Sequence, residues 1–310
     1  DSGLESDTPG RLTTYTNLAN LCRQMGRLDE ALSWYQRALT ASERVGEPAA
    51  LALLNNLAGL YQEMGRSDEA VEWYQRALQI GLPDDPTVLA TYNNLASLYQ
   101  KMGRNDEAVA WYRRALQVGR SDDPALLATY NNLASLYQKM GRIDEAVAWF
   151  KRALQIGRLD DPALLATYNN LAALYQKIGQ SDEAIDWYRR ALEIGRPDDP
   201  ALLATFNNLA ALYHKVGQSD QAIEWYRHAL QIGRSSDPAF LATYNNLAAL
   251  YQKIGRSEEA VECYQHALRM TAKSGRPGDT AILSIYNNLG TLYRKLARHE
   301  EAIDTYMRAL

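Results

Sequence analysis

One segment of 38 residues recurs along nearly the whole chain, and this repetition limits the fold more than any other feature of the sequence. Seven glycines mark it, separated by 39 residues once and by 38 residues five times: Gly26, Gly65, Gly103, Gly141, Gly179, Gly217 and Gly255. An eighth copy follows after 42 residues, with Ala297 in the glycine position. A fixed period of roughly 20 to 50 residues is typical of a solenoid, in which each copy packs only on its neighbours. We therefore predict a single repeat array, with its repeats at about residues 9–45, 48–83, 85–121, 123–159, 161–197, 199–235, 237–275 and 279–310.

Each copy has the pattern of two helices joined by a tight turn. In the third copy, Asp85 suits the N-cap and Pro86 the first position of a helix that ends at Gly103. A second helix is predicted from about Asp106, whose charge suits the positive end of the helix dipole, to about Val118. The same signals recur in the other copies, so the sequence predicts an all-α fold.

Apolar and polar residues divide each predicted first helix into two faces. At about 100° per residue, Tyr92, Leu95 and Tyr99 fall in one half of the circumference, while Asn94 and Lys101 fall in a polar arc on the other side. The second helix has a similar division. Because a pair of helices with such wide apolar faces cannot bury them alone, we expect the copies to stack on one another.

The residues at the helix-packing positions resemble the tetratricopeptide repeat. The third copy shows this pattern as Leu95-Ala96, Tyr99, Gly103, Ala108, Tyr112 and Ala115. The long copy, with its Asn-Asn-Leu-Ala segment, is most similar to the variant found in kinesin light chains. The resemblance implies a right-handed superhelix whose first helices line a concave groove, and a function in binding extended or helical peptide segments. The family's aromatic residue just after the glycine is missing, and we suggest that a tryptophan in the second helix compensates.

Paired asparagines occupy the polar arc of the first helix in seven copies. The second asparagine is predicted to form a ladder that binds a peptide backbone, because an amide offers both a donor and an acceptor: Asn56, Asn94, Asn132, Asn170, Asn208, Asn246 and Asn288. The first asparagine is a further candidate for peptide binding: Asn93, Asn131, Asn169, Asn207 and Asn245. The alternatives are that these amides bond between neighbouring first helices, face water, or are copies of one ancestral residue.

Basic residues follow the asparagines on the same arc: Arg23, Lys101, Lys139, Lys177, Lys215, Lys253, Arg294 and Lys295. With Glu63 as its only acid, the arc has eight basic residues and one acidic residue, a net charge of +7, whereas the whole chain carries −4. A concave surface of one sign concentrates ligands of the opposite sign. We therefore predict an acidic or phosphorylated extended segment as the ligand, lying toward the C-terminal copies. The alternative is that the lysines only keep the surface soluble.

Tryptophan occurs six times and always at one position of the second helix: Trp34, Trp73, Trp111, Trp149, Trp187 and Trp225. We interpret it as packing between helices, and the alternative is an outer contact surface. Cys263 and Thr305 replace it in the last two copies, which predicts looser packing there.

Several classes of function find no support in the sequence. The negative net charge argues against nucleic acid as the main partner, and no apolar run is long enough to span a membrane. No signal peptide is visible, and Cys22 and Cys263 are too far apart in a solenoid to pair, which favours a reducing, cytoplasmic setting. The four histidines show no metal-binding spacing, and no catalytic motif is present. We therefore expect no enzyme activity, cofactor or metal.

Other roles stay open at this point. The chain could be a structural, oligomerisation or sensor module of a larger signalling protein that uses its ends or outer surface. We expect the last helix to leave an apolar face uncovered through Ile303, Tyr306 and Leu310, so that self-association is possible there. We also expect the chain to be a piece of a longer protein. An engineered array and an enzyme subunit with its catalytic part elsewhere are the remaining alternatives.

Overall fold

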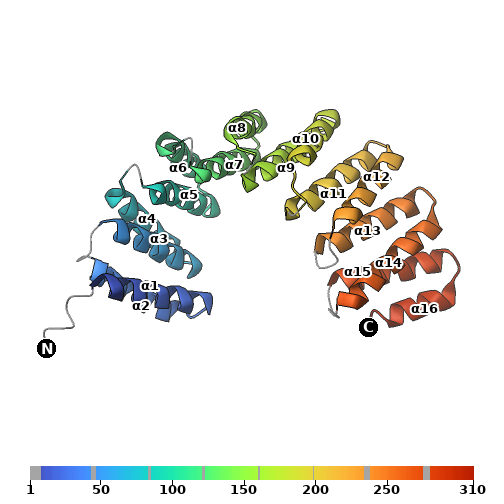
Figure 1. The fold of residues 1–310 in the computed structure, drawn as a ribbon, viewed down its shortest axis with the longest axis horizontal. Coiled ribbons are helices and arrows are strands. Elements are labelled where there is room, and N and C mark those ends of the chain that lie inside the picture. The colour runs from blue at the N-terminus through green and yellow to red at the C-terminus, as the bar shows by residue number, and fades with distance from the viewer. Residues whose placement is uncertain are drawn as a thin grey trace. The chain divides into compact units, whose positions relative to one another are not determined.

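The computed structural model describes residues 8–42, 47–82, 85–120, 123–159, 161–197, 199–233, 238–274 and 280–310. These ranges contain helices but no strand, and the helices form eight consecutive hairpins (Figure 1). The odd-numbered first helices are α1 (Thr8–Gln24), α3 (Glu47–Glu63), α5 (Pro86–Lys101), α7 (Pro124–Lys139), α9 (Pro162–Lys177), α11 (Pro200–Lys215), α13 (Pro238–Lys253) and α15 (Thr280–Lys295). The even-numbered second helices are α2 (Leu28–Ser42), α4 (Ser67–Ile80), α6 (Asn105–Val118), α8 (Ile143–Ile156), α10 (Ser181–Ile194), α12 (Ser219–Ile232), α14 (Ser257–Ser274) and α16 (His299–Met307). The prediction of an all-helical array of hairpins is confirmed.

The Asp-Pro dipeptides start the first helices as the sequence predicts. The Asp85 side chain accepts a hydrogen bond from the Thr87 backbone amide at 2.8 Å, and Pro86 follows as the first helical residue. The same bond recurs at the start of α7, α9 and α11. A side-chain acceptor thus satisfies one of the free amides at each of these helix ends.

A left-handed residue ends each first helix. Gly103 has a φ of 79°, and the Arg104 amide then donates to the Tyr99 carbonyl at 2.9 Å, which closes the end of α5. Ala297 takes the same conformation in the eighth hairpin, at a φ of 59°, although its side chain makes this conformation unfavourable. The turn therefore persists where the glycine is lost.

The chain divides into two compact units, residues 1–157 and 158–310, which contain four hairpins each. Within each unit, a second helix packs on the first helix of its own hairpin and on the first helix of the next hairpin. Successive first helices from α3 to α7 and from α9 to α15 also contact each other, whereas no comparable contact joins successive second helices in the described residues. The first helices therefore form the inner layer of each unit.

Small residues let the two helices of a hairpin approach closely. Ala96 of α5 and Ala108 and Ala115 of α6 are fully buried at 0% exposure, and Tyr112 is buried beside them. The same alanine and aromatic positions are buried in the other hairpins up to the seventh, whereas Tyr306 and Ala309 of the eighth are half-buried. These residues form the core that the repeat pattern predicts.

The tryptophans pack between helices, as predicted. The Trp111 ring lies 5.9 Å from the Tyr92 ring and 6.4 Å from the Tyr99 ring, both on α5. On its other side the guanidinium of Arg114 lies 4.5 Å from the indole centroid. Stacked aromatics and a cation over an indole are each favourable. Each of the six tryptophans contacts the ring of a tyrosine or phenylalanine of its own first helix, in a stacked or tilted arrangement.

Candidate functional site

One exposed line of side chains runs along each regular first helix. On α5, Ala90, Asn94 and Lys101 are exposed and Ser97 is half-buried. Their spacing of three or four residues places them on one side of the helix. The same line is present on α7, α9, α11 and α13, so the second asparagine and the lysine share one face of each helix, as the sequence predicts.

Most of the predicted ligand-binding side chains on this line are exposed. They are Asn94, Asn132, Asn170, Asn208, Asn246, Lys101, Lys139, Lys177, Lys215, Lys253, Lys295 and Arg294. Asn56 and Asn288 are half-buried, and Asn288 donates to the Asn245 Oδ1 at 2.7 Å. The last pair of first helices therefore departs from the regular arrangement.

Two contacts show that these lines face the same way on successive first helices. Arg23 of α1 binds Glu63 of α3 with a nitrogen–oxygen distance of 2.6 Å. Lys253 of α13 lies 3.1 Å from the Nε2 of His214 on α11. The two contacts join equivalent positions. Arg23 and His214 lie three residues before the turn glycine of their own repeat, and their partners lie two residues before the turn glycine of the next repeat. Within each unit, the C-terminal ends of the first helices thus share one surface.

The Arg23–Glu63 pair neutralises the single acid of the arc. The hydrogen bond from Arg23 is the main reason that the pKa of Glu63 lies below its usual value, and it raises the pKa of Arg23. In the second unit, the exposed basic side chains on the first helices have no carboxylate partner among the described residues: Lys177, Lys215, Lys253, Arg294 and Lys295. The positive charge is therefore concentrated in the second unit.

His214 adds no charge to this surface near neutral pH. Burial, and then the neighbouring charge of Lys253, lower the pKa of His214 below its ordinary value. The neutral ring therefore accepts a hydrogen bond from the Lys253 ammonium. Its Nδ1 is buried without a partner.

The first asparagine of each pair occupies a different environment. The Asn93 Nδ2 donates to the Thr129 Oγ1 of the next first helix at 2.7 Å, and Thr129 in turn donates to the Ala125 carbonyl. Thr129 is fully buried, and the same bond joins Asn55 to Thr91, Asn169 to Thr205 and Asn207 to Thr243. These threonines and asparagines form a seam of hydrogen bonds between successive first helices. The first asparagine thus fits the alternative in which these amides bond between neighbouring first helices.

The role of Asn93, Asn169, Asn207 and Asn245 toward a ligand stays a prediction, and these residues are left out of the candidate surface. The amide nitrogens of the first three are engaged in the seam, and Asn245 accepts from Asn288. The Oδ1 atoms of Asn93, Asn169 and Asn207 are also out of contact with solvent. For Asn131, the Oδ1 is buried in the same way, and we leave this residue out of the candidate surface.

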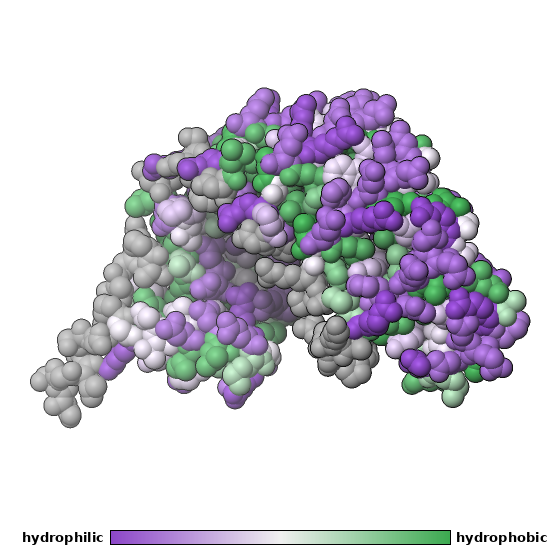
Figure 2. Space-filling model, turned by 45° about the vertical axis from the view of Figure 1, so that its right-hand side comes forward, coloured by the Kyte–Doolittle hydropathy of each residue, from purple (hydrophilic) through white to green (hydrophobic). Residues whose placement is uncertain are grey.

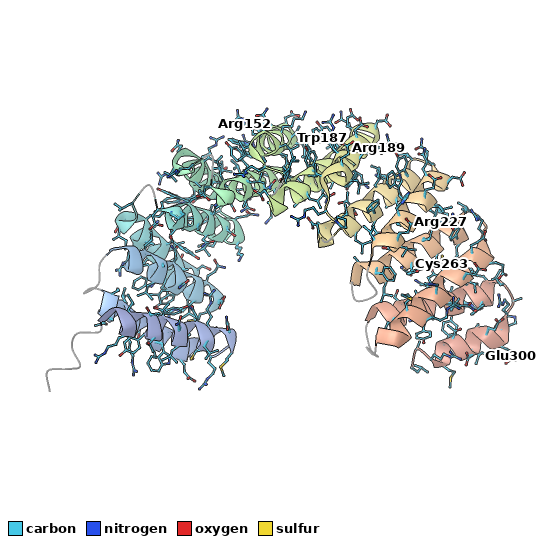
Figure 3. All side chains as sticks on the ribbon, viewed as in Figure 1. Arg152, Trp187, Arg189, Arg227, Cys263 and Glu300 are labelled. Atoms are coloured by element: carbon cyan, nitrogen blue, oxygen red, sulfur yellow. The ribbon has the colours of Figure 1, made fainter. Side chains whose placement is uncertain are left out.

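The outer side of each unit carries further links between repeats. Arg189 of α10 and Arg227 of α12 donate to the hydroxyls of Tyr213 and Tyr251 on the following first helices, at 2.6 and 3.0 Å (Figure 3). Hydrophilic and apolar side chains alternate over the face drawn in Figure 2. These arginines, which the sequence analysis left without a role, connect one hairpin to the next.

No group of three or more histidine, cysteine, aspartate or glutamate side chains that could hold a metal occurs in the described ranges. Cys22 is buried, Cys263 is half-buried, and neither forms a disulfide; burial raises the pKa of the Cys263 thiol to about 11. None of the described helices has the length and apolar character that crossing a membrane requires.

Comparison with known proteins identifies one family. The model of the tetratricopeptide repeat matches residues 10–82, 49–121, 87–159, 125–196, 163–235 and 240–310. No curated protein matches the chain. Among solved structures, a putative kinesin light chain of Podosopora anserina with nearly identical TPR-like repeats is 29% identical, with 61% of this chain and 95% of that chain covered at a TM-score of 0.49. The MamA protein is 23% identical, with 59% and 91% covered at a TM-score of 0.45.

Proposed function

Because the chain belongs to the tetratricopeptide repeat family, whose members generally mediate protein–protein interaction and are typically not enzymes, we propose that it is an adaptor that holds an extended, acidic segment of a partner protein. We assign this segment to the first-helix surface, defined within each unit by itself as the exposed asparagines and basic residues of its first helices. In the first unit these are Asn94, Asn132, Lys101 and Lys139, and in the second unit Asn170, Asn208, Asn246, Lys177, Lys215, Lys253, Arg294 and Lys295.

The observation that carries this proposal is that the second asparagine of each regular pair is exposed and makes no hydrogen bond within the described residues. Asn94, Asn132, Asn170, Asn208 and Asn246 are exposed in the middle of helices and make no hydrogen bond to the described residues. Asparagine there costs helix stability, about 0.5 kcal/mol relative to alanine. Since the fold gains nothing in return, a role toward a ligand accounts for these residues. Each amide can donate to a peptide carbonyl and accept from a peptide amide, whatever the side chains of that peptide.

The charge of the surface supports an acidic ligand. Five exposed basic residues lie on the first helices of the second unit, and no acidic residue lies on the same line there. Charges of one sign on one surface raise the local concentration of an opposite charge and speed its association. The partner segment is therefore expected to bind the second unit more tightly than the first.

Titration with peptides tests both parts of the proposal. Fluorescence anisotropy would compare an extended Asp/Glu-rich peptide with a Lys/Arg-rich peptide of equal length, at low and physiological salt. We expect the acidic peptide to bind more tightly, with affinity falling as salt rises. Charge reversal by Lys177→Glu, Lys215→Glu and Lys253→Glu is expected to abolish this preference. A preference for the basic peptide would overturn the proposal.

The amides are tested by truncation. A variant with Asn170→Ala, Asn208→Ala and Asn246→Ala is expected to lose at least about tenfold in affinity, because each lost hydrogen bond contributes roughly 0.5–1.5 kcal/mol. The matched control removes three exposed amides from second helices by Gln117→Ala, Gln155→Ala and Gln231→Ala, and it is expected to bind as the wild type does. Equal losses in both variants would contradict the assignment of the first-helix surface.

A second candidate function is self-association through α16. Ile303 and Met307 on this helix are 59% and 66% exposed, which is unusual for large apolar side chains. Light scattering over a range of protein concentrations would test this. A mass that stays monomeric at high concentration, or one that does not change on Ile303→Glu, would exclude this interface.

A further inference from the structure

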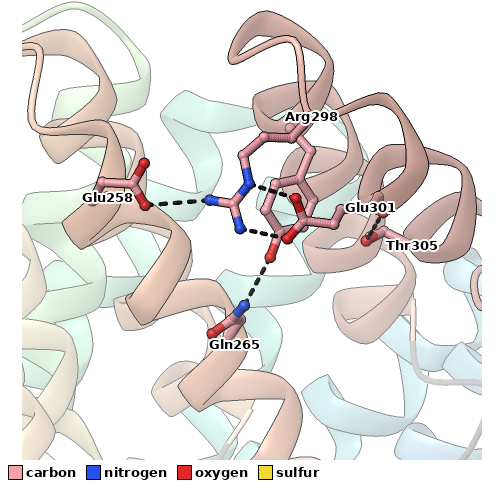
Figure 4. Close-up of polar contacts among 6 residues, drawn as sticks. Glu258, Gln265, Arg298, Glu301 and Thr305 are labelled. Carbon is pink, nitrogen blue, oxygen red and sulfur yellow. Dashed lines mark hydrogen bonds and ion pairs between the residues drawn. The ribbon is translucent and has the colours of Figure 1, made fainter.

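A cavity of about 820 Å³ lies between the last three helices, apart from the first-helix surface. Tyr286, Leu289 and Tyr293 of α15 contribute to its lining, together with Leu268 of α14. Thr305 and Arg308 of α16 also face it. Figure 4 shows this corner, where Gln265 of α14 donates to the Tyr293 hydroxyl at 2.7 Å and Arg298 bridges Glu258 and Glu301. The bond from Gln265 thus links the Tyr293 ring to α14.

The cavity lies at the position that tryptophan fills in the first six repeats. Thr305 stands in the tryptophan position of the eighth repeat. In the third repeat, the indole of Trp111 is held between two tyrosines of the first helix and an arginine three residues later on the second helix. The corresponding residues of the eighth repeat are Tyr286, Tyr293 and Arg308, and all three line the cavity. The groups that surround an indole are thus retained, while the indole itself is replaced by a small side chain.

In the seventh repeat, which has also lost the tryptophan, another ring lies against the first-helix tyrosine. Cys263 replaces the tryptophan there, and His266 takes the position of the arginine. The His266 ring stacks on Tyr244 at 5.2 Å, with a hydrogen bond of 2.7 Å between the Nδ1 and the tyrosine hydroxyl. In the seventh repeat, the ring of His266 therefore packs on Tyr244. In the eighth repeat, the residue at the equivalent position, Arg308, binds Asp304 instead, at 2.9 Å.

We propose that this cavity binds a planar aromatic side chain, a tryptophan indole, from a partner protein. The chain itself shows a similar arrangement five times, because Trp34, Trp111, Trp149, Trp187 and Trp225 each contact the aromatic ring at the position of Tyr286. In the second repeat, where Leu54 takes this position, Trp73 stacks on Tyr61 at the position of Tyr293. An indole from outside would stack on Tyr286 and Tyr293, and Arg308 could cover it after leaving Asp304. Stacking and a cation over the ring are the interactions that favour an indole over an aliphatic side chain of similar size. This site is independent of the first-helix surface, so a partner could engage both.

The probe for this proposal is 5-fluoroindole, observed by ¹⁹F NMR so that the protein's own tryptophans do not interfere. The wild-type protein is expected to broaden and shift the ¹⁹F signal in a saturable manner. Thr305→Trp, which fills the cavity from within, is expected to weaken this binding at least tenfold and to raise the melting temperature. Ser284→Trp places an indole on an exposed position of the same α15 and serves as the matched control, with binding unchanged.

A second variant covers the case in which Thr305→Trp does not fold. Tyr286→Ala removes the stacking partner without filling the space, and it is also expected to weaken binding at least tenfold. N-acetyltryptophanamide in place of the probe, and a peptide with one tryptophan against the same peptide with alanine, extend the test to a partner side chain. The proposal is overturned if the wild type shows no saturable binding, or if a folded Thr305→Trp or Tyr286→Ala variant binds the probe as tightly as the wild type.

Discussion

Replacing Thr205 by valine tests the seam between first helices. The Thr205 side chain is fully buried, accepts from the Asn169 Nδ2 at 2.8 Å and donates to the Ala201 carbonyl at 2.9 Å. Valine keeps the shape of threonine but has no oxygen. The Asn169 amide nitrogen therefore loses its partner, while the Ala201 carbonyl can still accept from the helix backbone. The substitution isolates the bond between the two helices.

The expected magnitude follows from leaving a donor of the half-buried Asn169 unpaired. Such a group costs about 1–3 kcal/mol, so Thr205→Val should lower the free energy of unfolding by about that amount. Adding Asn169→Ala removes the unpaired amide, and the double variant should be less destabilised than the sum of the two single variants. We expect a coupling free energy of about 0.5–1.5 kcal/mol.

Urea unfolding followed by circular dichroism measures these differences. Hydrogen exchange in α9 and α11 shows in addition whether the loss is local, because a repeat array does not always unfold in one step. Thr305→Val is the control: Thr305 is 6% exposed and has the same bond to a carbonyl four residues earlier, at 2.7 Å, but receives no asparagine bond within the described ranges. Equal destabilisation by Thr205→Val and Thr305→Val, or strict additivity of the two changes in the seam, would refute the reasoning.

Three further predictions concern stability. Ala297→Gly should raise the free energy of unfolding by about 1 kcal/mol in urea titrations, because it removes a side chain from a φ of 59°; a loss of stability would contradict this. Gly195→Ala should lower it by about 1–3 kcal/mol, since an added Cβ would lie 2.3 Å from the Leu202 Cδ1; a neutral result would mean that Leu202 can move aside. For His214, the pKa in the folded state is lowered by burial and by Lys253, so the folded state binds a proton less readily than the unfolded state does. Stability is then full above the unfolded pKa of about 6.5 and falls below it, and His214→Gln should reduce this fall between pH 7 and pH 5.

The helix pairs could be predicted because their signals are local. Asp85 and Pro86 lie next to the amides that they affect, and Gly103 lies at the turn that needs a left-handed residue. Such short-range chemistry does not depend on how the hairpins stack. The 100° periodicity was likewise enough to place Asn94 and Lys101 on an exposed line.

The two asparagines of a pair could not be separated in this way. Asn93 and Asn94 both fall in the polar arc, and only the position of the neighbouring helix decides that one of them meets a buried threonine. A signal was nevertheless present, since Thr129 stands two residues before the asparagine pair of its own repeat, and Ile285 takes this position in the eighth repeat. Where the threonine is absent, Asn245 bonds to Asn288 instead. A conserved pattern inside the chain can thus mix a structural and a ligand-binding residue at adjacent positions.

The departures of the eighth repeat from the other repeats are not scattered at random over its structure. Ile285 changes the seam, Ala297 strains the turn, and Thr305 opens a cavity whose aromatic lining is kept. The regular repeats present the same asparagine amide and the same lysine, which suit recognition of a peptide backbone and of negative charge. Many protein segments share these two features, so they do not distinguish one partner from another. A cavity that occurs in one repeat can recognise one particular side chain. Specificity for a single partner is therefore expected to come from the eighth repeat, and affinity from the first-helix surface.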